Sequence, residues 1–100
     1  MSEVQTLSSA IESWRADLDK YYDEIKTFNQ IPIKIVFQKL AGYSAYASHV
    51  RLKLMRVNTS AAKSFRLSEI DPFIETLEFQ FKVWSRLASV LQVEWEMNSK

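Results

Sequence analysis

Hydrophobic residues recur every three or four positions in three long segments of this chain, which is the spacing of one face of an α-helix. The segments cover residues 3–28, 33–57 and 72–97. The chain has only one Gly and two Pro, too few for the many turns of an all-β fold. The pattern therefore predicts an all-α protein with three amphipathic helices.

Short breaks separate the three segments. Pro32 fits the first turn of a new helix, because it has no backbone N–H to donate. Asn58 suits the left-handed position after a helix, and Asp71 with Pro72 is typical of a helix start. We expect residues 58–70 to be a long connection. Three helices of about 25 residues, each about 38 Å long, then predict a single-domain, elongated up-down-up three-helix bundle over residues 1–100.

Gly42 is the weak point of the second helix, because a mid-helix Gly costs about 1 kcal/mol relative to Ala. Its neighbours Ala41, Ser44 and Ala45 are also small. We interpret this as a close contact between helices or a kink. The alternative is the close approach of a ligand to the backbone.

The net charge of +1 hides a strong segregation along the sequence. Residues 1–28 hold six acidic and three basic residues, and so do residues 68–100. Residues 29–67 hold seven basic residues and no acidic one. The middle of the chain is therefore a candidate for binding an anionic partner.

One face of the middle helix carries much of this charge. Lysines and arginines on such a helix can neutralise backbone phosphates, and an aromatic ring beside them can stack on an unpaired base. The candidate nucleic-acid-binding residues are Lys34, Lys39, Tyr46, His49, Arg51, Lys53, Arg56, Lys63 and Arg66. The competing interpretation is that these cations pair with the acidic first and third helices, or with another protein.

The third helix has more apolar surface than one partner helix can cover. Beside its main apolar stripe, a further set of hydrophobic residues lies on other faces. The candidate protein-interface residues are Phe79, Val83, Val90 and Val93. Either this helix occupies the middle of the bundle, or it docks a partner protein or a second copy of the chain.

Catalysis and metal binding have little support in the sequence. The chain has no Cys and a single imidazole, His49, whose own helix offers no carboxylate within reach. Neither a Gly-rich phosphate loop nor a paired Glu-x-x-His motif is present. We expect neither an enzyme nor a cofactor. No apolar run is long enough for a bilayer, and no signal peptide is apparent, so we expect a cytoplasmic protein without membrane contact.

Several residues resemble a known family. They are Lys20-Tyr21-Tyr22-Asp23-Glu24-Ile25 with Phe28, then Phe37-Gln38-Lys39-Leu40-Ala41-Gly42-Tyr43 with Arg51, and the aromatic residues Phe79, Phe81 and Trp84. In these the chain resembles the small subunit of CRISPR effector complexes, especially the type III version, although Leu87-Ala88-Ser89-Val90 departs from the family pattern. The resemblance implies a non-catalytic helical subunit that repeats along a filament and faces nucleic acid.

Two functions follow from these patterns. The first is a non-catalytic assembly subunit that contacts the backbone of DNA or RNA through its basic middle helix, within a larger complex. The alternative is a helical protein-interaction adaptor or a homo-oligomeric scaffold with no nucleic-acid binding.

Overall fold

The protein is helical throughout the part described by its computed structural model. That part comprises the backbone of residues 3–98 and the side chains of residues 6–92. The elements are α1 (Glu3–Ile25), the short 3-10 helix η1 (Phe28–Gln30), α2 (Ile33–Arg56), α3 (Ser60–Phe65), the π-helical segment η2 (Arg66–Ile70) and α4 (Asp71–Asn98). No strand occurs in residues 3–98, so the all-α prediction is confirmed.

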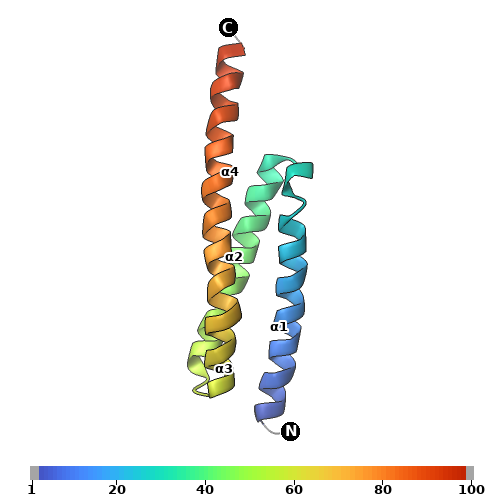
Figure 1. Cartoon of the computed structure of the whole chain (residues 1–100), viewed down its shortest axis with the longest axis vertical. Coiled ribbons are helices and arrows are strands. Elements are labelled where there is room, and N and C mark those ends of the chain that lie inside the picture. Colours follow the sequence, from blue (N-terminus) through green and yellow to red (C-terminus); the bar gives the residue numbers. More distant parts are fainter. Residues whose placement is uncertain (1–2, 99–100) are drawn as a thin grey trace.

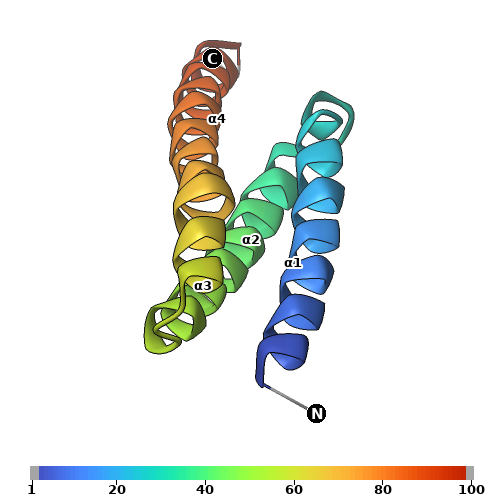
Figure 2. The same cartoon turned by 60° about the horizontal axis from the view of Figure 1, so that its bottom comes forward.

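The chain changes direction twice along a narrow molecule of 66 × 20 × 16 Å. After α1 it turns back along α2, and after α2 it turns again into α3, which continues through η2 into α4 (Figure 1). Both views show that α4 extends well beyond the turn between α1 and α2 (Figures 1 and 2). They also show that the lower halves of α1 and α2 diverge, so the two ends of the molecule differ in construction.

The first helix ends at Ile25, whereas the periodicity predicts that it ends at residue 28. The hydroxyl of Thr27 donates to the carbonyl oxygen of Glu24 at 2.8 Å, and η1 follows. This turn directs Phe28 into the core, where it is 1% exposed. Its ring lies 6.3 Å from those of Tyr43 and Trp84. The apolar repeat continues through Phe28 because that residue is buried, although not as part of α1.

The expected long connection between residues 58 and 70 is wrong. Val57 is extended, with φ −98° and ψ 106°, and no described residue has a positive φ, so Asn58 is not left-handed. Thr59 instead begins a new helix, because its side chain accepts a hydrogen bond from the N–H of Ala62 at 3.2 Å. From Ser60 onward the chain stays helical through α3, η2 and α4.

Asp71 and Pro72 do not start a helix but lie inside this continuous one. A proline ring normally clashes with the carbonyl group four residues earlier, here that of Ser68. In η2 the N–H of Asp71 bonds instead to the carbonyl oxygen of Arg66, five residues earlier. The wider π turn makes room for the proline. Asp71 and Pro72 are therefore residues that ordinarily begin a helix, but the wider π turn lets the helix continue through them.

Aromatic rings join α1 to the rest of the core. Tyr21 stacks on Tyr43 with ring centroids 4.4 Å apart and on Phe73 at 6.1 Å. Trp14 stacks on Phe65 at 6.2 Å. The buried hydrophobic residues come from every α-helix and from both short segments: Leu18, Phe28, Val36, Leu40, Tyr43, Ala47, Val50, Leu54, Ala62, Phe65, Ile70, Phe73 and Leu77.

Gly42 does not mark a close helix contact. It is exposed, and a Cβ built on it meets no other atom within 4 Å. The small residues around it therefore reflect helix surface rather than tight packing. None of the helices in the described part of the chain is both long and apolar enough to cross a membrane.

Candidate nucleic-acid interface

Four exposed basic residues lie in the last turns of α2 and in α3, on either side of the turn between them. His49, Lys53 and Arg56 are spaced by four and three positions, which places them on one face of α2. Lys63 lies on the other side of the turn, in a hollow that Asn58 and Thr59 also line. We call these four residues, His49, Lys53, Arg56 and Lys63, the basic corner.

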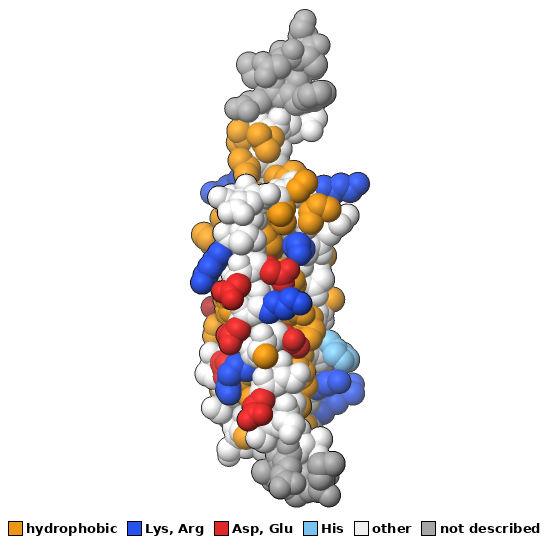
Figure 3. All heavy atoms as spheres, turned by 90° about the vertical axis from the view of Figure 1, so that its right-hand side faces the viewer, with side chains coloured by type: hydrophobic (Ala, Val, Ile, Leu, Met, Phe, Trp, Pro, Cys, Tyr) orange, Lys and Arg blue, Asp and Glu red, His pale blue; other side chains and the backbone are white. Residues whose placement is uncertain are grey.

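No described carboxylate forms an ion pair with a residue of the basic corner. Figure 3 shows acidic and basic side chains intermingled over the middle of the molecule, while basic side chains collect beside the single histidine at one edge. The positive charge at this edge is thus uncompensated among the described residues. It is the property that phosphate binding requires.

Two of the predicted cations are neutralised within the chain. The Nζ atom of Lys39 lies 2.9 Å from Oε1 of Glu24 on α1. The hydrogen bond from Lys39 is the main reason that the pKa of Glu24 is lowered. Arg66 lies 3.6 Å from the carboxylate of Asp71. These two residues follow the charge-pairing interpretation rather than the phosphate-binding one.

Tyr46 is not placed to stack on a base. Its hydroxyl donates a hydrogen bond to Oδ2 of Asp17, and its ring packs edge-on against Tyr21 at 5.3 Å. Burial is the main cause that raises the pKa of Tyr46, and the hydrogen bond to Asp17 adds to it. The residue thus joins α2 to α1.

The remaining two predicted residues lie away from the basic corner. Lys34 is exposed in the first turn of α2, at the opposite end of that helix. Arg51 lines a different hollow of about 630 Å³ between α2 and α4, together with Glu75 and Glu78. Four of the nine candidates are therefore exposed and without a described ion pair in the last turns of α2 and in α3, and the other five have partners, are partly buried or lie elsewhere.

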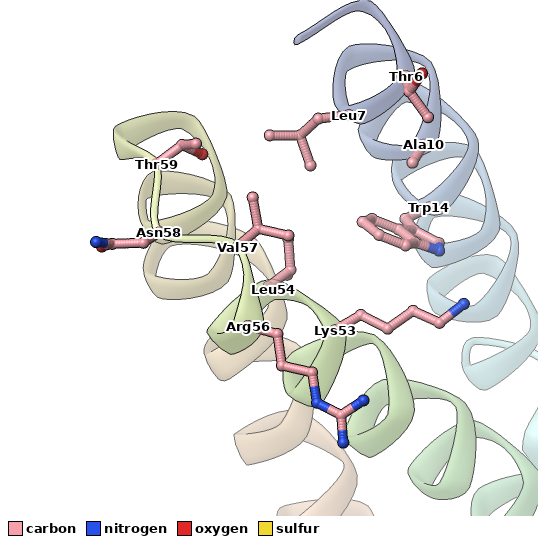
Figure 4. A pocket seen from close by; sticks show the side chains of 10 residues that line it. All are labelled: Thr6, Leu7, Ala10, Trp14, Lys53, Leu54, Arg56, Val57, Asn58 and Thr59. Carbon is pink, nitrogen blue, oxygen red and sulfur yellow. The ribbon is translucent and has the colours of Figure 1, made fainter. Parts of the chain in front are cut away.

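An open groove of about 780 Å³ lies beside the basic corner, between the diverging ends of α1 and α2. In Figure 4 the side chains of Leu7 and Trp14 point from α1 toward Val57, while Lys53 reaches across toward α1. Arg56 also lines the groove. The sequence did not indicate this groove, because apolar residues of a helical stripe are ordinarily covered and nothing in the stripe shows where two helices diverge.

The second candidate surface is the outer face of α4. Phe79 is 62% exposed, Val83 41% and Val90 54%. Leu87 and Leu91, which were not among the predicted interface residues, are exposed as well. The side chain of Val93 lies outside the described ones. Leu91 is uncovered because α4 extends past its neighbours.

Metal ligands do not converge in the part of the chain whose side chains are described, where no group of three or more His, Asp or Glu residues is close enough to hold an ion.

Comparison with models of known families, with curated proteins and with solved structures finds no match for this chain. The resemblance to the small subunits of CRISPR effector complexes therefore stays a prediction, and functional inference rests on the surfaces described above.

Proposed function

We propose that this protein is a non-catalytic helical subunit that contacts the phosphate backbone of a nucleic acid through its basic corner, within a larger complex. The observation that supports this function is the exposure of Lys53, Arg56 and Lys63 with no described carboxylate paired to them. Contacts of this kind carry no sequence information and bind DNA and RNA alike.

The strength of such binding depends steeply on salt. When the logarithm of affinity is plotted against the logarithm of salt concentration, each phosphate that the protein neutralises adds about −0.9 to the slope on duplex DNA. On a single strand it adds about −0.7. Three cations therefore give a slope between roughly −2 and −3. A slope near zero would contradict a backbone contact.

The experiment compares two double variants with the same change in net charge. Lys53→Glu/Arg56→Glu reverses two cations of the basic corner, whereas Lys20→Glu/Lys82→Glu reverses two exposed cations that are not among the candidates. Fluorescence anisotropy with single- and double-stranded oligonucleotides measures affinity, and circular dichroism checks helicity. We expect the first variant to lose binding by more than tenfold and the second to lose little. Equal losses would mean that only overall charge matters, and unchanged binding by the first variant would remove the proposal.

We also propose that the three long helices form an elongated up-down-up bundle, that the protein acts in the cytoplasm, and that it works like the small subunit of type III CRISPR effector complexes. The alternating directions of α1, α2 and α4 in Figure 1 support the first point. The absence of cysteine suits a reducing compartment. The basic corner on a small helical body is compatible with the last point.

An alternative function is supported by a separate observation, the exposed apolar face of α4. We propose as this alternative a protein-interaction adaptor or homo-oligomeric scaffold, since contiguous exposed apolar surface marks interaction sites. Sedimentation velocity separates the two functions. A protein that stays monomeric at high micromolar concentration and binds oligonucleotides fits the first function alone, and a self-associating protein that ignores oligonucleotides fits the second.

A further inference from the structure

Among the described residues, the hydrophobic core and the side chains packed against it reach no farther along α4 than Trp84. The last ring contacts of α4 with the rest of the molecule are those of Phe81 with Phe37, at 6.5 Å, and of Trp84 with Phe28, at 6.3 Å. Beyond Trp84 the helix continues to Asn98, which adds about 20 Å. Both ribbon views show this part of α4 standing clear of α1 and α2 (Figures 1 and 2). We call residues 85–98 the α4 tip.

One face at and just before the α4 tip carries hydrophobic side chains in a helical seam. Val83, Leu87 and Val90 are spaced by four and three positions, so they fall on one line of the helix. All three are exposed, between 40% and 54%. The spacing is that of residues that meet a second helix side by side. We call these three residues the apolar seam.

The charged residues in the last part of α4 are segregated by sign, and this favours a second copy of the chain in one orientation. Lys82 and Arg86 lie near the body, and the sequence places Glu94 and Glu96 farther along the same helix. Arg86 and Glu94 are each four positions from Val90. A second α4 that runs antiparallel and crosses at Val90 would set position 86 opposite position 94 of the other copy, twice. A parallel pair would set each charge against itself, which is unfavourable.

We propose that two copies of this chain pair through their α4 tips, antiparallel, about a two-fold axis close to Val90. The inference rests on the scaffold function proposed above and specifies its geometry. Two-fold dimers are the commonest closed oligomers. The basic corner lies at the opposite end of the molecule, so this dimer leaves it free.

The size of the contact sets the expected strength. Two helix ends of about 20 Å bury less than the roughly 1,200–2,000 Å² of a standard interface, and such small interfaces are typical of weak, reversible complexes. We therefore expect an equilibrium between monomer and dimer at micromolar concentrations. Analytical ultracentrifugation over a range of concentrations measures it.

The apolar part of the proposal is tested with a matched pair of variants. Val90→Asp places a charge in the centre of the apolar seam, and Ser85→Asp places the same charge on an exposed position of α4 away from it. We expect Val90→Asp to raise the dimer dissociation constant more than tenfold and Ser85→Asp to change it less than threefold. A dimer that persists in Val90→Asp overturns this geometry, although the scaffold function then stands through another face.

The charge pairing is tested by reversal. Arg86→Glu alone sets two carboxylates against each other across the interface, and Glu94→Arg alone sets two guanidinium groups together, so each weakens the dimer. The double variant Arg86→Glu/Glu94→Arg restores both pairs, and we expect its dissociation constant to return to within about threefold of the original at low salt. Failure of the double variant to recover overturns the antiparallel register.

Orientation is tested by cross-linking, since the natural chain has no cysteine. In the proposed dimer position 87 faces position 93, because they lie three residues on either side of Val90. An equimolar mixture of Leu87→Cys and Val93→Cys chains should form mixed disulfides under mild oxidation, whereas Leu87→Cys alone should form few. Efficient cross-linking of Leu87→Cys with itself would mean a parallel pair and would overturn the proposal.

Discussion

The hydroxyl of Tyr46 on α2 donates a hydrogen bond to the carboxylate of Asp17 on α1, a residue 29 positions earlier in the sequence. The ring of Tyr46 lies edge-on against Tyr21, which itself stacks on Tyr43. These contacts join the C-terminal half of α1 to the middle of α2. Tyr46, which was predicted from the sequence to contact nucleic acid, therefore stabilises the fold.

Replacing Tyr46 with Phe tests this role. The change keeps the ring contacts and removes the donor to Asp17, so we expect the free energy of unfolding to fall by about 1 kcal/mol. Urea denaturation followed by circular dichroism measures it. Oligonucleotide affinity should not change, because the ring packs against α1 instead of presenting a face to a base. An affinity loss with unchanged stability would show instead that Tyr46 contacts the ligand.

Stability should decline in alkaline solution. Burial is the main cause that raises the pKa of both Tyr43 and Tyr46 above the ordinary tyrosine value of about 10. A raised pKa means that the folded protein holds these protons more tightly than the unfolded chain. Their contribution is therefore complete below pH about 10 and is lost as the pH rises above it.

Ultraviolet absorbance of tyrosinate, followed together with circular dichroism, checks the pH prediction. We expect part of the tyrosine ionisation to coincide with loss of helix. Ionisation of all four tyrosines at an ordinary pKa, with the helix intact, would contradict it. Tyr46→Phe should reduce the alkaline loss of stability, because one of the tyrosines with a raised pKa is then absent.

Replacing Gly42 with Ala should stabilise the protein. The position is exposed within α2, and an added Cβ meets open space, so the change only lowers the entropy of the unfolded chain and favours helix. We expect the free energy of unfolding to rise by about 0.5–1 kcal/mol. Thermal and urea denaturation measure it. Destabilisation would mean that another chain packs closely against this position, and an affinity loss would identify a ligand contact.

Thr59 is the residue on which the start of α3 depends. Thr59→Ala removes the acceptor for the N–H of Ala62, which we expect to cost about 1 kcal/mol. Thr59→Ser keeps that acceptor and serves as the control, with a much smaller loss expected. Urea denaturation compares the three proteins. Equal stability of the Ala and Ser variants would contradict a capping role.

The sequence predicted the long helices because apolar residues with a regular spacing report directly on a buried helical face. It did not predict α3, since Asn58, Thr59 and Pro72 are residues that ordinarily interrupt helices. Thr59 in fact caps the new helix, and η2 accommodates Pro72. Local signals of this kind do not distinguish a break from a cap or a widened turn.

The candidate nucleic-acid interface could also be predicted only in part, because ion pairs between helices cannot be read from one helix alone. The lack of acidic residues between positions 29 and 67 drew attention to α2, but cations on one helix can pair with acids on another. Lys39 meets Glu24 because of the way α1 is rotated about its axis, and that rotation is decided by aromatic packing around Tyr21. The spacing of residues along α2 does not show how the neighbouring helix α1 is rotated about its own axis.

The π turn of η2 has a consequence for how the chain tolerates changes in its length. The π turn holds one residue more than an α-helical turn. Deleting one residue from Arg66–Ile70 would return it to an α-helical turn with little rotation of α4, but it would remove the room for Pro72, whose ring would then clash with the carbonyl group four residues earlier. Exposed residues of this segment, such as Leu67 and Ser68, can be replaced by other residues with little effect on stability. The number of residues in the segment cannot be changed in the same way.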